Sequence, residues 1–224
     1  MVFRVNCERV GFRPLALQDF DFIIERIPFR NSVFAGNVLG FIDLNSNKET
    51  MLDSPGPCHF VCFDSAGRYV AAATGRNILV YETRDGKLIS ELATNGSISS
   101  IEFGLKEGTL IVCVNGVQVW NIDSGTRARW LLGHEQIVNK SASLTSANGQ
   151  IITASRDAKF KTWNFNAPKN PRQTHLHDGP VRDIANSTDG KWFASASEDG
   201  NVAVFSKSGS INFILPHPCP VLAV

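Results

Sequence analysis

The sequence has 224 residues, 43% hydrophobic and 19% charged, which is a globular composition and not that of a disordered chain. Lys and Arg number 22 against 21 Asp and Glu, so the formal net charge is +1, without the global basic excess that phosphate binding favours. Residues 1–12 lack the apolar run of a signal peptide, and no window approaches the about 20 apolar residues of a membrane helix. Five cysteines, an odd number, favour buried free thiols and an intracellular protein, cytoplasmic or nuclear.

Short apolar segments that end near an aromatic residue recur along the chain. Their aromatic residues lie 39 to 43 positions apart, at Phe41, Tyr81, Trp120, Trp163 and Phe205. Apolar and polar residues alternate around each one, which predicts a strand with one buried face. Another apolar strand is expected before each, followed by a Gly, Asn or Asp turn that predicts a tight hairpin. These preceding strands are expected at 32–36, 69–74, 110–114, 151–155 and 192–197.

Two further strands complete each unit of the pattern. One is expected upstream of the hairpin, at 59–64, 97–103, 137–143 and 180–186, and one between units, at 87–92, 128–132, 174–176 and 211–215. Four short antiparallel strands in about 40–45 residues predict an all-β fold, a β-propeller of four-stranded blades. We expect one domain over 1–224, with third strands ending near residues 44, 83, 122, 165 and 206 and a partial blade at 207–224. Residues 1–30 fit the pattern poorly and receive no strand assignment.

Two of the repeats carry a further motif. The first has Gly133-His134, then Asp157, then Trp163-Asn164, and the next has His177, Asp199 and Phe205 in the same order, with the Asp six positions before the aromatic residue in both. These residues resemble the WD40-repeat (WD-repeat) family. The resemblance covers nearly the whole chain, strongly over 94–224 and weakly over 1–60. The first three repeats, those with Phe41, Tyr81 and Trp120, have no turn Asp.

The resemblance implies a buried hydrogen-bond network in each of these repeats. In the first, His134 would bond Asp157 and Thr153, and Thr153 would reach the indole N–H of Trp163. In the second, Phe205 has no N–H, so the network would contain His177, Ser195 and Asp199. Such a network satisfies polar groups that would otherwise be buried without partners.

The last residues resemble the start of the preceding repeat, with His217 and Val221 at the positions of His177 and Val181. Propellers of this family mostly have seven blades, whereas about 40–45 residues per blade gives roughly five blades and a fraction here. We therefore expect an incomplete ring. Three explanations stay open: a fragment or truncated product, a last blade shared with residues 1–20, or completion by another chain.

No catalytic, cofactor or metal site is expected. Cys58-His59-x-x-Cys62 lies on an expected strand, where alternation puts His59 on the face opposite the two cysteines, so we expect core thiols and not zinc ligands. His175 and His177 could be a ligand or catalytic pair, but the resemblance gives His177 a structural role. Nucleophile, phosphate-loop and dinucleotide motifs are missing from the sequence, which predicts a protein without enzymatic activity or a small-molecule substrate.

The resemblance implies that other proteins, as peptides or domains, dock on the rim of the propeller. The candidate rim residues, on the loops of the two motif-bearing repeats, are Gln136, Arg156, Asp178, Arg182 and Glu198. The predicted function is a non-enzymatic scaffold or adaptor in a multi-subunit complex.

An alternative is an RNA-associated component of a ribonucleoprotein or ribosome-assembly complex. It rests on a local group of basic residues, which we call the basic strip: Arg156, Lys159, Lys161, Lys169 and Arg172. The competing interpretation is that these residues are solvated strand and loop positions, because runs of charge are common on outward-facing surfaces.

Overall fold

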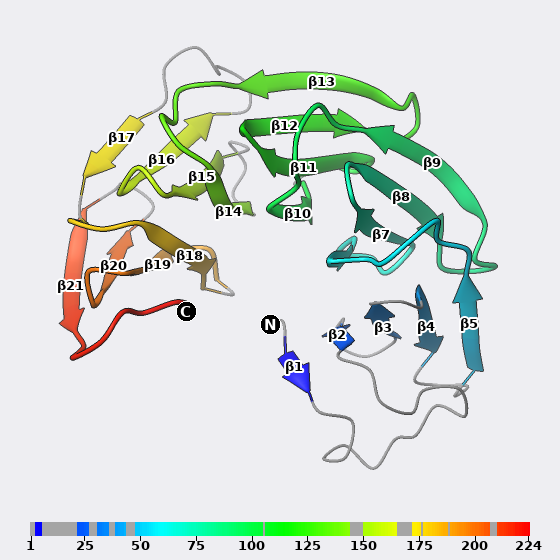
Figure 1. The fold of residues 1–224 in the computed structure, drawn as a ribbon, viewed down its shortest axis with the longest axis horizontal. Coiled ribbons are helices and arrows are strands. Elements are labelled where there is room, and N and C mark those ends of the chain that lie inside the picture. The colour runs from blue at the N-terminus through cyan, green and yellow to red at the C-terminus, as the bar shows by residue number, and fades with distance from the viewer. Residues whose placement is uncertain are drawn as a thin grey trace. The chain divides into compact units, whose positions relative to one another are not determined.

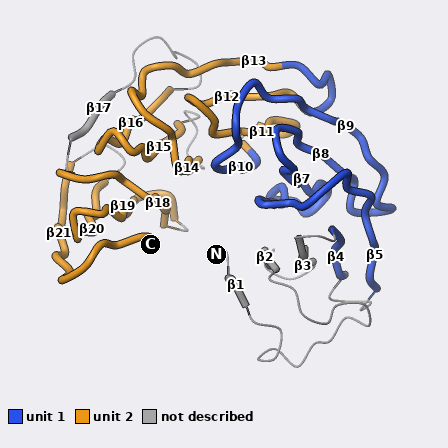
Figure 2. The backbone as a smooth tube through the Cα atoms, viewed as in Figure 1, with its two compact units in different colours: residues 1–103, 122–126 blue, residues 104–121, 127–224 orange. Residues whose placement is uncertain are grey.

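The computed structural model describes residues 3–5, 22–26, 31–35, 39–43, 48–104, 106–143, 150–164, 172–175, 177–187, 189–206 and 210–224. Every regular element in these ranges is a β-strand, which confirms the all-β prediction (Figure 1). Across the same ranges there is no helix with the length and apolar character needed to cross a membrane. The chain divides into two compact units, residues 1–103 with 122–126 and residues 104–121 with 127–224 (Figure 2).

The first unit contains two antiparallel sheets in which the strands follow chain order. The first sheet has five strands: β1 (Phe3–Val5), β2 (Phe22–Arg26), β3 (Asn31–Ala35), β4 (Leu39–Asp43) and β5 (Lys48–Leu52). The second has four: β6 (Phe60–Phe63), β7 (Tyr69–Thr74), β8 (Asn77–Glu82) and β9 (Leu88–Ala93). Strand β10 (Ser100–Phe103) also belongs to this unit.

The second unit begins with β11 (Thr109–Val114), β12 (Gly116–Asn121) and β13 (Thr126–Leu131) in consecutive order. Two complete four-stranded antiparallel sheets follow it along the chain. One consists of β14 (Val138–Ser143), β15 (Gln150–Ser155), β16 (Lys159–Asn164) and β17 (Arg172–His175). The other consists of β18 (Val181–Asn186), β19 (Trp192–Ser197), β20 (Asn201–Ser206) and β21 (Ile211–Pro216). Such sheets have the strand number and order of propeller blades.

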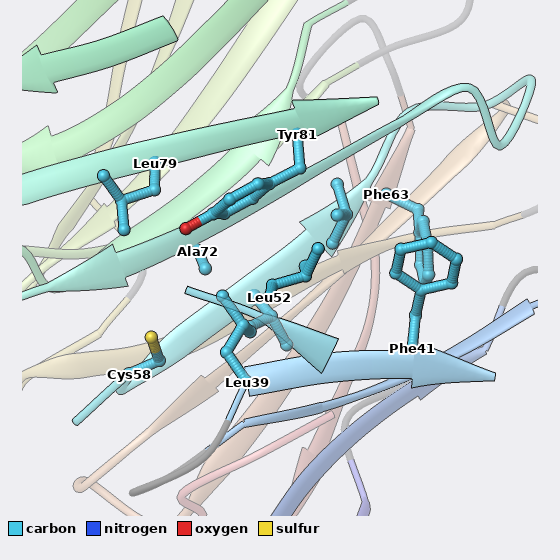
Figure 3. Packing of buried hydrophobic residues seen from close by; sticks show 10 residues of the cluster. Leu39, Phe41, Leu52, Cys58, Phe63, Ala72, Leu79 and Tyr81 are labelled. Atoms are coloured by element: carbon cyan, nitrogen blue, oxygen red, sulfur yellow. The ribbon is translucent and has the colours of Figure 1, made fainter. Parts of the chain in front are cut away.

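In the first unit the core lies between the apolar faces of β4 and β5 and those of β6, β7 and β8. Leu39, Phe41 and Leu52 pack in one cluster with Phe63 and Tyr81, and all five are at most 8% exposed (Figure 3). The hydroxyl of Tyr81 donates a hydrogen bond to the carbonyl of Asp53. Burial, together with the nearby acidic groups of Cys58, Asp53 and Glu91, raises the pKa of Tyr81 to about 12, so this phenol stays protonated as a donor.

In the second unit, alternate residues of β16 serve two different clusters. Trp163 packs with Ile111, Val119 and other residues of β11, β12 and β13, whereas Phe160 packs with Phe193 and Phe205 of the last sheet. The rings of Phe160 and Phe205 stack with their centroids 4.2 Å apart. Both faces of this sheet are therefore buried, which fits stacked blades that cannot bury their apolar faces alone.

The strand positions agree closely with the predicted pattern. Residues 69–74 and 192–197 form β7 and β19 over the predicted bounds. The first sheet differs, because it has five strands instead of four. Its first two strands, β1 and β2, come from residues 1–30, which the repeat pattern left unassigned. In the stretch predicted as a partial blade, residues 211–216 pair with β20 as the outer strand β21, and residues 217–224 form no strand.

Candidate functional site

Four side chains of the repeat at 132–164 form a continuous hydrogen-bond chain. His134 comes from the loop before β14, Thr153 from β15, Asp157 from the turn after β15, and Trp163 from β16. His134 Nδ1 lies 2.8 Å from Asp157 Oδ2, and His134 Nε2 lies 2.7 Å from Thr153 Oγ1. Trp163 Nε1 donates to Thr153 Oγ1 at 2.9 Å. The structure thus brings together all four residues for which the family resemblance implied a network.

The protonation states of this network follow from its burial. The side chains of His134 and Asp157 are 1% and 2% exposed. Burial lowers the pKa of His134, and the hydrogen bond with Asp157 offsets this only in part. Burial alone would raise the pKa of Asp157, but hydrogen bonds from His134 and from the backbone N–H groups of Glu135 and Lys159 outweigh it, and the net pKa is lowered.

At neutral pH the pair is therefore a neutral imidazole and a carboxylate. The assigned tautomer follows: Nδ1–H donates to Asp157, and Nε2 accepts the Thr153 hydroxyl proton. Thr153 in turn accepts the indole N–H of Trp163. Each polar atom has a partner within the repeat, so the network holds the loop at 133–135 and the turn at 157 together, and both ring nitrogens are engaged.

The repeat at 177–206 builds the same arrangement without the aromatic donor. His177 Nδ1 lies 3.0 Å from Asp199 Oδ2, and His177 Nε2 lies 2.8 Å from Ser195 Oγ. Asp199 also accepts the backbone N–H groups of Asp178 and Asn201 at 2.9 and 2.8 Å. Burial would raise the pKa of Asp199, but these donors together lower it. Phe205, at the position of Trp163, stacks on Phe160 and Phe193 instead.

The turn that carries the Asp has a left-handed residue in both repeats, but the identity of that residue differs. In the first, Ala158 has a φ of 63°, a left-handed conformation that costs a non-glycine residue free energy. In the second, Gly200 takes this place with a φ of 85°. A Cβ on Gly200 would lie 2.8 Å from the carbonyl oxygen of His217, so the second turn also needs glycine for space.

The repeats without a turn Asp satisfy their aromatic polar groups in other ways. Trp120 Nε1 donates to Gln118 Oε1, two residues earlier on β12, at 3.0 Å, and both side chains are buried. Tyr81 uses the Asp53 carbonyl. Sequence reasoning missed Gln118 and Asp53 as partners. The alternation of β12 contains the signal for Gln118, because residues two apart on a strand share a face.

The five candidate rim residues fall into two groups. Gln136, Arg156 and Asp178 are exposed. Arg182 and Glu198 are half-buried and bind each other: Arg182 Nε donates to Glu198 Oε1 at 2.6 Å, and its Nη2 donates to the same oxygen. Arg182 lies at a β-bulge between Val181 and Asp183, a feature that re-aims a side chain out of the regular alternation.

The position equivalent to Arg182 in the preceding repeat is Asn139. It lies at the corresponding bulge between Val138 and Lys140, and its Nδ2 donates to the carbonyl of Val181 at 2.7 Å. One bulge therefore joins neighbouring sheets within this unit, and the other holds an ion pair. Of the five candidate rim residues, the exposed ones are therefore Gln136, Arg156 and Asp178.

The basic strip is not a continuous exposed surface, and this corrects the expectation for Lys161. Lys161 is 4% exposed and its Nζ donates to the carbonyl of Gly133, while the Lys159 side chain is 13% exposed and its Nζ lies 3.2 Å from Glu135 Oε1. The reason is strand alternation: Lys159 and Lys161 share the face of β16 that buries Trp163. Arg156 is exposed, whereas Lys169 and the Arg172 side chain lie outside the described residues.

The next residues are the cysteines and histidines that were considered as metal ligands or catalytic groups. Cys58 and Cys62 are buried, His59 is exposed, and Cys58 Sγ lies 3.2 Å from Ser54 Oγ. Cys219, by contrast, is exposed, contrary to the expectation of a buried thiol. Over the described ranges no group of three or more His, Cys, Asp or Glu side chains is placed to hold a metal ion. The side chain of His175 lies outside the described residues.

Comparison with known proteins gives a family match and several distant relatives. The family model described as "WD domain, G-beta repeat" matches residues 169–206. Pre-mRNA-processing factor 17 of Homo sapiens is 25% identical over 154 residues, which cover 65% of this chain and 26% of that protein. A guanine nucleotide-binding protein subunit beta of Oryza sativa subsp. japonica is 27% identical over 135 residues, which cover 54% of this chain and 35% of that protein.

A third relative is the nuclear distribution protein nudF of Emericella nidulans, which is 30% identical over 83 residues. These cover 37% of this chain and 19% of nudF. The matched part of this chain thus spans between 19% and 35% of the length of these relatives.

Proposed function

The chain belongs to the WD40-repeat proteins, and from this premise we propose that it is a non-enzymatic scaffold or adaptor that binds other proteins within a multi-subunit complex. Its partners would dock, as peptides or domains, on the loops of the motif-bearing repeats. We place this function in the cytoplasm or the nucleus.

The observation that carries the proposal is the use of polar groups for rigidity in two successive repeats. His134 and His177 each have both ring nitrogens hydrogen-bonded, to Asp157 and Thr153 and to Asp199 and Ser195. A base that must accept a proton from a substrate has to lie within hydrogen-bond reach of it, whereas the side chains of His134 and His177 are 1% and 0% exposed. Rigid loops that keep their own polar groups satisfied, with exposed side chains beside them, suit a binding platform.

The loops provide exposed side chains of mixed chemistry beside these networks. Gln136 and Arg156 flank the first network, and Asp178 flanks the second, where its backbone N–H is already fixed by Asp199. An amide, a cation and an anion on rigid backbone can give specificity without ordering the loops on binding.

The alternative function is an RNA-associated component of a larger complex. The name of one relative, pre-mRNA-processing factor 17, keeps this alternative in view. Its physical support is weaker than that of the scaffold, because Lys161 is buried and Lys159 is paired with Glu135. Phosphate binding depends on accessible cations.

The test is affinity capture of the tagged chain from lysate, with and without nuclease. The variant is Arg156→Glu with Asp178→Lys, which reverses both rim charges. The matched control is Arg84→Glu with Asp85→Lys, which makes the same two changes on exposed residues of the turn after β8. We expect a defined protein set that survives nuclease, is lost in the rim variant and is kept in the control. Loss of the set with nuclease would instead favour the RNA alternative.

A further inference from the structure

An exposed arginine–tryptophan surface lies on β13, away from the loops discussed above. Five of the six residues of this strand are exposed, and only Leu131 points into the core, at 3% exposure. Trp130 is 40% exposed and the adjoining Leu132 is 60% exposed. We call Arg127, Arg129, Trp130 and Leu132 the β13 surface.

The apolar part of the β13 surface is held in place. The guanidinium of Arg127 lies over the ring of Trp130, 4.4 Å from its centroid, which is a cation–π contact. A Cβ on Gly116 would lie 3.1 Å from Trp130 Nε1 and 3.3 Å from Leu132 Cδ2, so the missing side chain of Gly116 makes room for both. Trp130 is thus an ordered aromatic residue that still exposes much of its area, the kind of residue that anchors interfaces.

The charged part of the β13 surface is uncompensated. Across the described residues, no ion pair joins Arg127 or Arg129 to a carboxylate. Other arginines do have such partners: Arg84 lies 3.4 Å from Asp85, and Arg182 binds Glu198. Glu135, three residues after Leu132 in the sequence, is already paired with Lys159. Two neighbouring cations therefore face solvent next to an exposed indole.

β13 is also the last strand in the order of its sheet, next to β12 (Figure 1). The outer edge of such a strand presents backbone N–H and C=O groups that can pair with an added extended chain. A peptide strand with carboxylates between apolar residues would satisfy this edge, neutralise the two arginines and cover Trp130 and Leu132. RNA fits less well, because Arg127 already occupies one face of the only exposed indole of this surface.

We propose that the β13 surface binds an extended acidic peptide by strand addition, with Arg127 and Arg129 contacting its carboxylates and Trp130 and Leu132 its apolar side chains. The inference rests on the proposed scaffold function but names a second surface, separate from the rim residues. It predicts that the protein can hold one partner on the rim and another on β13.

The test uses a fluorescein-labelled peptide, acetyl-Glu-Val-Glu-Val-Glu-Val-Glu-amide, and follows its fluorescence anisotropy as the full chain is added. We expect saturable binding that weakens with salt, and a rise in Kd of about tenfold or more in Arg127→Glu with Arg129→Glu. Arg76→Glu with Arg84→Glu makes the same change of charge on two other exposed arginines and should leave Kd within about twofold. Trp130→Ala should weaken binding, whereas Trp192→Ala should not, although the two tryptophans are 40% and 39% exposed.

Further probes test the strand addition and the ligand class. Of two peptides N-methylated at all valines or at all glutamates, one should lose binding, because only one set of N–H groups faces the β13 edge. Equal binding of both would overturn strand addition. Binding of oligouridylate in place of the peptide, or of neither probe, would overturn the proposal. Neither result would touch the rim function, which the capture experiment tests with Arg127 and Arg129 intact.

Discussion

The repeats at 132–164 and 177–206 share a hydrogen-bonded pair of a loop histidine and a turn aspartate, which we call the His–Asp corner, but combine it with different aromatic residues. In the first, the indole of Trp163 closes the chain through Thr153. In the second, the chain stops at Ser195, and Phe205 contributes ring stacking at 4.2 Å to Phe160 instead. The shared part is the turn carboxylate with its three donors. The comparison teaches that the His–Asp corner is what these two repeats share, whereas their aromatic residue can exchange a hydrogen bond for packing.

The largest expected effect comes from removing the shared carboxylate. Asp157→Ala leaves His134 and two backbone N–H groups without their acceptor, and should lower the free energy of unfolding by about 1–3 kcal/mol. Asp199→Ala should cost a similar amount, since Asp199 also has three donors. Urea unfolding measures both, with Asp178→Ala as the exposed control. A loss confined to one repeat would show that the corner is not equivalent in the two.

The next effect separates the turns, and its sign differs between them. Gly200→Ala forces a Cβ to within 2.8 Å of the His217 carbonyl at a φ of 85°, and should destabilise by about 2 kcal/mol. Ala158→Gly relieves the strain at a φ of 63° and should stabilise by about 0.5 kcal/mol. Both the thermal and the urea midpoint should therefore fall in Gly200→Ala and rise in Ala158→Gly. Two shifts of the same sign would contradict the view that the turns share one conformation.

A double-mutant cycle isolates the donor that only the first repeat has. Trp163→Phe combined with Thr153→Val should give a coupling energy of about 1 kcal/mol, because the Trp163–Thr153 hydrogen bond is buried. The matched cycle of Phe205→Leu with Ser195→Ala should give a smaller coupling, since no hydrogen bond joins that pair. Equal coupling in the two repeats would mean that packing, not the indole N–H, links the aromatic residue to the corner.

The smallest expected effect is on pH dependence. The pKa of His134 in the folded state lies below its ordinary 6.5, so the unfolded chain takes up this proton first on acidification. The contribution of His134 to the free energy of unfolding should therefore be steady above pH 6.5 and decline as the pH falls below 6.5. The lowered pKa of Asp157 keeps its contribution until pH drops below 3.8. Urea unfolding at pH 7 and 5 should show this decline in the wild type and a shallower one in His134→Gln; an unchanged slope would assign it elsewhere.

Much of the fold followed from the sequence because strand alternation and turn residues are local signals. β7 and β19 have the predicted bounds, with all but the first residue of β7 buried. The network residues followed from the resemblance to the WD40-repeat family, and the missing indole donor followed from Phe205 itself. The extra strand in the first sheet had no signal, because residues 1–30 do not share the repeat.

The errors at the site arose because charged residues were assigned to the surface without asking which face of the strand holds their side chains. Lys161 was assigned to a solvated strip, yet it lies two residues before Trp163 on the same face of β16 and is 4% exposed. The pairing of Arg182 with Glu198 was equally hidden, since a bulge moves Arg182 out of the regular alternation. This pairing depends on which strand lies beside β18, and that is non-local information, whereas the face of Lys161 could have been inferred from alternation along β16.

Each of the two units contains at least one buried cysteine, whose rate of alkylation depends on how often that unit opens. Cys58 and Cys62 are buried in the first unit and Cys113 in the second, while Cys219 is exposed (Figure 3 shows Cys58 in its cluster). Burial raises the pKa of Cys58, which further slows formation of its reactive thiolate. An alkylating reagent will therefore modify Cys219 at once but must wait for a local opening to reach the others. Their separate alkylation rates would report how often each unit opens, without any substitution or label.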